Sequence, residues 1–142
     1  MTVTKRMLGI DYGSRRLGIA VSDPLGIIAK GIGVVFNDRS VIIEIKRYID
    51  EYDPAAIIIG MPLNLKGEKG QKALEVEQFI SQLEREITIE VIRWDERFTT
   101  STAHETMLQM GVKKKDRRVK STIDEMAAAL ILQSYLDSRK KL

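Results

Sequence analysis

The chain has 142 residues, 44% of them hydrophobic, and a formal net charge of +3. This length and apolar content predict one domain with its own core, over residues 1–142, and exclude two domains of ordinary size. The chain has no cysteine and one histidine, which excludes disulfide frames, thiolate zinc sites and mechanisms that need two imidazoles. No stretch approaches the ~20 apolar residues of a membrane span, and no signal-peptide core precedes Asp11. We therefore expect a cytoplasmic protein that does not bind membranes.

The first third of the chain predicts three strands and a helix. Apolar runs bounded by turn residues indicate strands at Arg6–Asp11, Leu17–Ser22 and Ile27–Phe36. The next segment predicts a helix that is capped by Asp38 and stopped by Asp53-Pro54. Its apolar residues recur at helical spacing: Val41, Ile42, Ile45, Ile49 and Tyr52.

The remainder of the chain alternates between strands and helices. A β-branched run in Ala55–Gly60 is typical of a strand covered on both faces, and a helix is expected over Glu68–Glu86. A fifth strand follows at Thr88–Ile92, and helices are expected at Thr99–Met110 and Thr122–Arg139. This order predicts an α/β fold in which a five-stranded mixed sheet is flanked by helices.

One segment concentrates positive charge. Between positions 113 and 120, six of eight residues are basic: Lys113, Lys114, Lys115, Arg117, Arg118 and Lys120. We expect a loop here that attracts the phosphates of a polyanion. The alternative is a loop that is only solvated.

Three acidic residues lie in distant segments, each where an apolar element begins or ends: Asp11, Glu96 and Asp124. Carboxylates at the edge of a core are costly to bury without a positive partner, so three that converge predict a site for divalent cations. Each also has a simpler interpretation, which is a turn hydrogen bond for Asp11, a surface ion pair for Glu96 and a helix cap for Asp124. Strand alternation lets only one of Asp95 and Glu96 face a given side, and it does not decide which.

Helical geometry favours an inward direction for Asp124. At ~100° per residue, Asp124 lies ~180° from the polar Gln133 and shares its side of the helix with Ala128 and Ile131. Glu125 is then free to cap the helix start. We expect the inward acid to meet a cation.

At these residues the sequence resembles the YqgF family, also called RuvX or Holliday-junction-resolvase-like proteins, within the ribonuclease H-like superfamily. The resemblance covers almost the whole chain. It is carried by five segments in order: Gly9–Ala20, Ser22-Asp23-Pro24, Gly60-Met61-Pro62-Leu63-Asn64, Asp95–Thr100, and Ile123–Ala128 with Leu132–Leu136. The start Asp11-Tyr12-Gly13 also resembles the first phosphate loop of actin-like ATPases, but these need two such domains and the chain has room for one.

The resemblance implies a ribonuclease H-like fold whose catalytic, metal-binding acids are Asp11, Glu96 and Asp124. It also implies a nuclease, an Mg²⁺-dependent endo- or exonuclease, in maturation of the 5′ end of pre-16S rRNA. Two alternatives stay open: a Holliday junction resolvase acting on four-way DNA junctions, and a non-catalytic module that binds RNA or ribosomal particles.

The expected chemistry uses two Mg²⁺ ions ~3.5–4 Å apart, bridged by Asp11, and Mn²⁺ is expected to substitute. Further nucleic-acid contacts are expected from the first hairpin, a strand end and the residue after Glu96: Arg15, Arg16, Asn64 and Arg97. Nucleic acid, precursor ribosomal RNA above all, is the expected partner. We expect a monomer or a weak homodimer.

Overall fold

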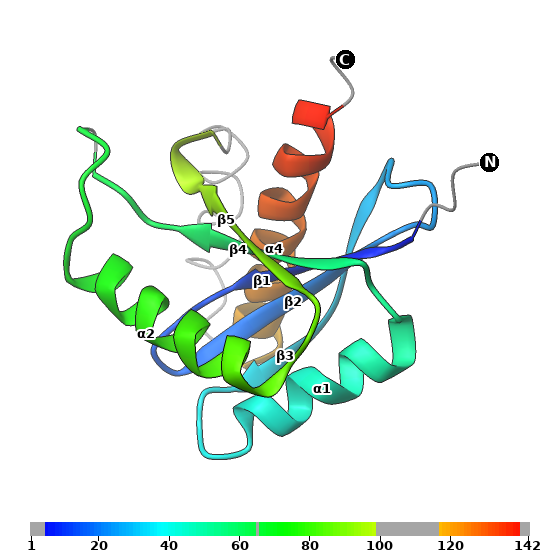
Figure 1. Cartoon of the computed structure of the whole chain (residues 1–142), viewed down its shortest axis with the longest axis horizontal. Helices are drawn as coiled ribbons and strands as arrows, with labels where there is room; N and C mark the ends of the chain where they lie inside the picture. Colours follow the sequence, from blue (N-terminus) through cyan, green and yellow to red (C-terminus); the bar gives the residue numbers. More distant parts are fainter. Residues whose placement is uncertain (1–4, 65, 99–116, 140–142) are drawn as a thin grey trace.

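A five-stranded mixed sheet lies at the centre of the computed structural model, which describes residues 5–64, 66–98 and 117–139 (Figure 1). The strand order across the sheet is β3-β2-β1-β4-β5. β1 pairs antiparallel with β2 and parallel with β4, which confirms the predicted mixed sheet. The strands are β1 (Met7–Asp11), β2 (Arg16–Ser22), β3 (Ala29–Phe36), β4 (Ala56–Met61) and β5 (Glu90–Asp95).

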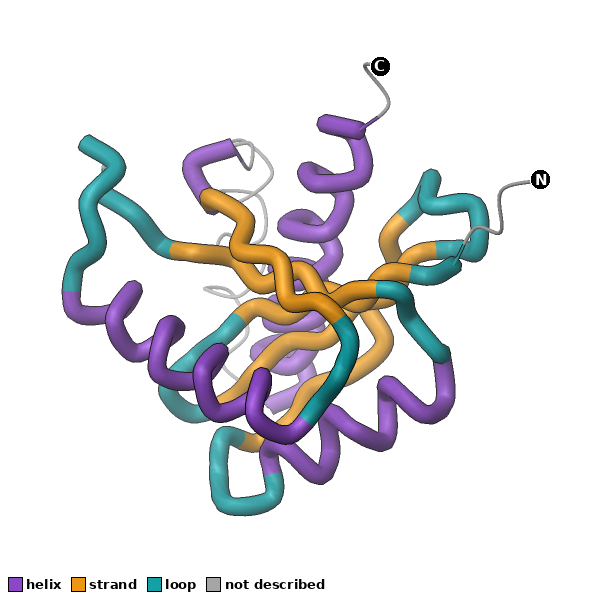
Figure 2. Tube along the Cα trace, in the orientation of Figure 1, coloured by secondary structure: helices purple, strands orange, loops and turns teal. Residues whose placement is uncertain are grey.

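Helices cover both faces of this sheet (Figure 2). The helices α1 (Val41–Tyr52) and α2 (Gln71–Glu86) pack on one face, and α4 (Arg117–Arg139) packs on the other. The β-branched run in β4 serves both layers, since Ile57 and Ile59 join the core under α1 and α2 while Ile58 joins the core under α4. In the described residues, no helix combines the length and the apolar content that crossing a bilayer requires.

The contact between α4 and the sheet is closest at Gly18 in β2. An ideal Cβ on Gly18 would lie 1.9 Å from the backbone carbonyl oxygen of Asp124. No real side chain tolerates such a distance, so the helix backbone reaches the strand only because residue 18 is glycine. This contact fixes the height of Asp124 above the sheet.

The last helix begins earlier than its sequence pattern predicts. α4 starts at Arg117 rather than at Thr122, and arginine and lysine are good helix formers. The prediction that Arg117, Arg118 and Lys120 belong to a loop is therefore wrong, because they lie at the start of α4. For the same reason Glu125 lies inside the helix and does not cap it.

Other predictions lie beyond the described residues. These are the basic residues Lys113, Lys114 and Lys115, and the expected helix Thr99–Met110.

The fifth strand extends to Asp95 instead of ending at Ile92. Arg93 and Trp94, near its end, contact helices on opposite faces of the sheet, as successive residues of a strand do. The side chain of Arg93 binds Glu77 on α2, whereas the Trp94 indole donates a hydrogen bond to Ser134 Oγ on α4 (3.0 Å). Asp95 is consequently the last strand residue, opposite Met61 in β4.

The predicted cap of α1 is also wrong in detail. Ser40 precedes the helix without a side-chain cap, and Asp38 Oδ1 instead accepts hydrogen bonds from the Ser40 backbone N–H (2.8 Å) and hydroxyl (2.6 Å). Asp38 therefore stabilises the turn before the helix. The predicted stop is confirmed, because Asp53 adopts a left-handed conformation (φ 46°) and its N–H bonds the Ile49 carbonyl.

Replacing Gly18 with alanine is expected to lower the free energy of unfolding by at least ~2 kcal/mol, because the new methyl group overlaps the backbone of α4. Urea unfolding followed by circular dichroism measures this loss. Gly70→Ala is the matched control, since an ideal Cβ there meets no atom within 4 Å. At this helix-start position the control is expected to lose less than ~1 kcal/mol. Equal small losses in both variants would contradict the close packing of α4.

Candidate active site

Asp11 stands at the end of the central strand β1, on the sheet face that α4 covers. Its partner across the antiparallel pair is Gly18 in β2. On the other side, β4 runs parallel to β1 with Ile10 opposite Ile59, so the register leads to Gly60 beside Asp11. The two strands next to Asp11 thus have glycine at the level of its carboxylate.

Glu96 reaches the site over Gly60. It is the first residue of the short 3₁₀ helix η1 (Glu96–Phe98), which follows β5 directly. An ideal Cβ on Gly60 would lie 2.9 Å from Glu96 Cγ and 3.1 Å from Cδ. The Glu96 side chain therefore occupies the space that any larger residue at position 60 would fill, next to Asp11.

Asp124 reaches the site over Gly18, and its carboxylate meets a cation, as the sequence predicts. Arg16 Nε donates a hydrogen bond of 2.6 Å to Asp124 Oδ2. The side chains of Arg16 and Asp124 are 30% and 23% exposed, so this ion pair is partly shielded from water. Arg16 was expected to contact nucleic acid, and in the structure it binds an acid of the candidate site.

The pKa of Asp11 reflects both its burial and the nearness of the other two acids. Burial, followed by the negative charge of Glu96, raises the pKa of Asp11 from 3.8 to about 7. The charge of Asp124 raises this pKa further, whereas that of Lys72 lowers it. Glu96 and Asp124 therefore both act on Asp11, and a positive charge placed beside Asp11 would be stabilised.

The described residues do not form a finished metal cage. No three histidine, aspartate or glutamate side chains among them meet closely enough to hold one ion. The donor set still suits Mg²⁺ in its chemistry, because Mg²⁺ takes one or two carboxylates and completes its shell with water and phosphate oxygens.

Asp95 and Glu96, which strand alternation alone could not separate, have different partners. Asp95 accepts hydrogen bonds from the Arg97 side chain, through Nε (2.9 Å) and Nη2 (2.6 Å), and from the Arg97 backbone N–H (2.9 Å). Hydrogen bonds from Arg97 are also the main cause that lowers the pKa of Asp95. Asp95 thus holds Arg97, while Glu96 lies over Gly60.

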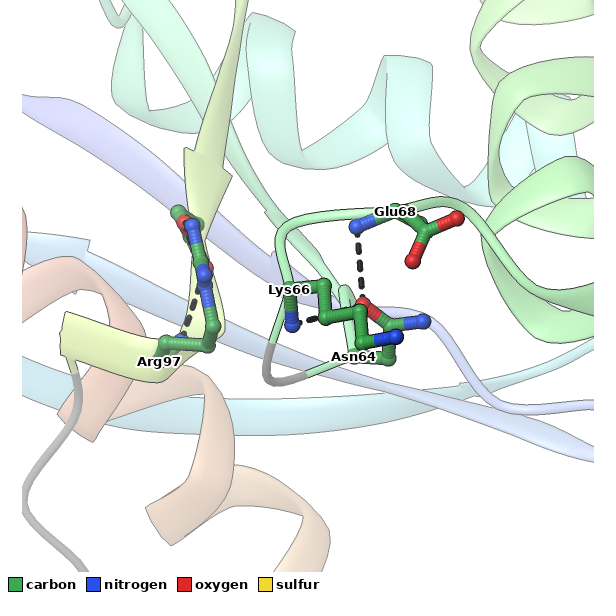
Figure 3. A network of polar contacts seen from close by, with 5 residues as sticks. Asn64, Lys66, Glu68 and Arg97 are labelled. Atoms are coloured by element: carbon green, nitrogen blue, oxygen red, sulfur yellow. Dashed lines mark hydrogen bonds and ion pairs between the residues drawn. The ribbon is translucent and has the colours of Figure 1, made fainter.

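Asn64 closes a loop beside Arg97 (Figure 3). Its Oδ1 accepts hydrogen bonds from the backbone N–H groups of Lys66 and Glu68, both 2.9 Å. The guanidinium of Arg97 lies against this loop, since an ideal Cβ on Gly67 would be 3.2 Å from Arg97 Nη2. Asn64 therefore shapes the loop with its oxygen, and the loop and Arg97 form one surface.

The structure adds a cation that the sequence did not indicate. Lys72 is exposed in the first turn of α2, and its charge acts on Asp11. A lysine at the start of an amphipathic helix is common, so only the closeness of α2 to the end of β1 reveals it. That closeness is visible in the packing of the Tyr12 and Phe79 rings, whose centroids are 5.0 Å apart. Arg15, by contrast, is exposed in the first hairpin.

The raised pKa of Asp11 predicts a pH-dependent stability of the metal-free protein. In the unfolded chain the pKa of aspartate is ~3.9, so between about pH 4 and 7 only the folded state keeps this proton. Stability contributed by Asp11 is complete below pH ~4 and is lost as the pH rises through ~7. Asp11→Asn removes this pH dependence. At pH 8 in EDTA, its free energy of unfolding is expected to be ~1–3 kcal/mol higher than that of the wild type.

Urea unfolding at a series of pH values measures this difference. The exposed Asp50 on α1 provides the control, because Asp50→Asn is expected to leave the wild-type pH profile unchanged. Parallel wild-type and Asp11→Asn profiles from pH 4 to 8 would contradict the raised pKa of Asp11.

Comparisons with known proteins identify the family of the chain. Residues 5–138 match the family RuvX, described as “Holliday junction resolvase”. The chain is 43% identical to a protein of Acetivibrio thermocellus over 96% of this chain and 99% of that protein. It is 41% identical to one of Ruminiclostridium cellulolyticum over 93% and 94% of the two chains. Both relatives carry the description “Putative pre-16S rRNA nuclease”.

Solved structures share the fold at low sequence identity. RuvC of T. thermophilus, in complex with a Holliday junction substrate, superposes with a TM-score of 0.60 at 16% identity and covers 96% of each chain. A fowlpox virus resolvase in complex with Holliday junction DNA gives 0.55 at 16% identity, covering 96% of this chain and 99% of that chain. These neighbours confirm the predicted ribonuclease H-like fold. The match over residues 5–138 and the two relatives show that the chain belongs to the RuvX family.

Proposed function

We propose that this chain is a metal-dependent nuclease that hydrolyses phosphodiester bonds during maturation of the 5′ end of pre-16S rRNA. The observation that carries the proposal is the gathering of acids around Asp11, with Asp124 over Gly18 and Glu96 over Gly60. The descriptions of the RuvX relatives support this substrate. The proposal includes a single ribonuclease H-like domain over residues 1–142 that acts in the cytoplasm.

The proposed roles follow from the chemistry of the three side chains. Asp11, Glu96 and Asp124 are the catalytic carboxylates and the metal ligands. These three residues would hold Mg²⁺, which would supply an activated water and charge neutralisation at the leaving oxygen, and Mn²⁺ is expected to substitute. The raised pKa of Asp11 means that protons compete with the metal, so metal affinity is expected to rise as the pH approaches 7.

Cations around the acids suit a phosphate backbone. Arg97 lies against the loop closed by Asn64, and Lys72 acts on Asp11 from the other helix layer. Three basic residues stand at the start of α4, on the same helix as Asp124: Arg117, Arg118 and Lys120. Such contacts are independent of sequence and weaken with salt, so we expect affinity for nucleic acid to fall steeply as the salt concentration rises.

Neutral replacements of the three acids are expected to remove cleavage. Asp11→Asn, Glu96→Gln and Asp124→Asn each lose the charge that holds the metal, and each is expected to reduce Mg²⁺-dependent cleavage of a 5′ pre-16S rRNA fragment at least ~100-fold. Asp95→Asn is the matched control, since Asp95 binds Arg97 rather than facing Asp11. It is expected to retain activity within ~10-fold, because it leaves the three acids in place and removes only a partly exposed ion pair. Gel analysis of cleavage in Mg²⁺, in Mn²⁺ and in EDTA measures each rate.

The pair Asp95 and Glu96 makes this test sharp, because the two residues are neighbours in the chain. Loss of activity in Asp95→Asn with full activity in Glu96→Gln would overturn the assignment of Glu96. Equal cleavage by the wild type and Asp11→Asn would overturn the metal site as a whole.

A second candidate substrate is the four-way DNA junction. The family description and the complexes formed by the structural neighbours favour it, although a shared fold does not fix a substrate. Cleavage of the rRNA fragment, single-stranded RNA, duplex RNA and junction DNA is therefore compared side by side. Symmetric cuts in the junction by a dimer, with no cleavage of RNA, would replace the rRNA proposal. Binding of the rRNA fragment without cleavage would favour a non-catalytic module.

The oligomeric state also helps to distinguish the two candidate substrates. Resolving a junction takes two active sites, whereas processing an RNA end takes one. We expect a monomer or a weak homodimer, which sedimentation velocity over a range of concentrations measures.

A further inference from the structure

Arg16 and Asp124 form an ion pair between the first residue of β2 and the α4 helix. The Nε–Oδ2 distance is 2.6 Å, and the partners are 108 residues apart in the chain. The proposed function gives each of them another partner, a substrate phosphate for Arg16 and a metal ion for Asp124. In the structure the two side chains bind each other.

Rigid elements hold the two partners at this distance. Arg16 pairs with Phe36 in β3, so its backbone belongs to the sheet. The carbonyl of Asp124 packs against Gly18, two residues further along β2. The backbones at the two ends of the ion pair are therefore fixed, and only side-chain rotation can separate the charges.

A divalent metal competes with Arg16 for Asp124. The guanidinium on Oδ2 leaves the lone pairs of Oδ1 available, but it already neutralises the charge of the carboxylate, and two cations on one carboxylate repel each other. Metal binding at Asp124 is consequently opposed until Arg16 moves away. Arg16 keeps 30% of its side chain exposed, so a rotated guanidinium can reach solvent and a bound phosphate.

We propose that Arg16 is an internal cation that occupies Asp124 until a divalent metal displaces it, and that the displaced guanidinium then binds a phosphate of the nucleic acid. This inference rests on the proposed function. It adds an order of events, because phosphate binding by Arg16 becomes available only when the metal has taken Asp124. Arginine suits the second task, since its planar guanidinium can donate two parallel hydrogen bonds to phosphate.

The first test measures metal affinity without nucleic acid. Mn²⁺ binding is followed by calorimetry for the wild type and Arg16→Gln, which removes the competing charge. Arg16→Gln is expected to bind Mn²⁺ ~10-fold more tightly. The matched control is the exposed neighbouring Arg15→Gln, which is expected to change the affinity less than ~2-fold because exposed charges are screened. In an Asp124→Asn background, Arg16→Gln is expected to have no effect.

The second test measures affinity for a single-stranded RNA that the wild type does not cleave, so that all three acids stay in place. Arg16→Gln is expected to weaken binding of this RNA ~10-fold in Mg²⁺ and less than ~2-fold in EDTA. Its salt dependence in Mg²⁺ is expected to correspond to one phosphate contact fewer. Opposite signs in the two tests are the signature of displacement, since a merely structural role of Arg16 would weaken both kinds of binding.

The outcomes separate this inference from the proposed function. Mn²⁺ binding that Arg16→Gln leaves unchanged or weakens would overturn the displacement and leave the nuclease proposal standing. Tighter binding that persists in the Asp124→Asn background would overturn it too, as a general charge effect. Absence of Mn²⁺ binding in both proteins would remove the metal site together with the displacement. If Arg16→Gln fails to fold, Arg16→Lys serves instead, and its looser pairing with Asp124 is expected to give tighter Mn²⁺ binding than in the wild type.

Discussion

The candidate site depends on two close approaches to the sheet, at Gly18 and Gly60. Asp11 sits on the strand between them, and the elements that carry the other two acids come from outside the sheet. Any side chain at position 18 would push the backbone of α4 away, and any side chain at position 60 would displace Glu96. The packing that holds α4 on the sheet therefore also sets where the carboxylates lie, so fold stability and site assembly share one constraint.

Bringing the acids together has an electrostatic cost that the cations of the protein offset only in part. The pKa of Asp11, raised to about 7, measures the remaining cost, to which burial contributes most. Lys72 and Arg16 supply compensating charge, Lys72 acting on Asp11 and Arg16 binding Asp124 directly. A partly exposed ion pair contributes modest stability, so the repulsion is reduced rather than removed. A cluster that is unfavourable without a ligand is the usual electrostatic character of a binding site.

Local sequence patterns predicted the parts of the structure that local interactions decide. The β-branched run gave β4, and the position of Asp11 before a turn gave the end of β1. Patterns failed where distant partners decide, because β5 extends to Asp95 through contacts of Arg93 and Trp94 with two different helices. The early start of α4 was missed since a run of basic residues is typical both of a solvated loop and of a helix.

The candidate site shows the same limit of prediction from local sequence patterns. Asp124 was predicted to face inward and meet a cation, and helical geometry sufficed for that. The identity of the cation depends on the contact between α4 and β2 across 108 residues, which no spacing along the chain reveals. Lys72 was missed for the same reason.

The two arginine–aspartate ion pairs differ in how they relate to the candidate site. Arg97 is bound by Asp95, two residues earlier, so metal binding does not need to disturb it, whereas Arg16 is bound by an acid of the site itself. A displaceable arginine couples metal binding to RNA binding, and thermodynamic linkage makes this coupling reciprocal. Whatever factor the metal adds to RNA affinity through Arg16, the RNA must add to metal affinity.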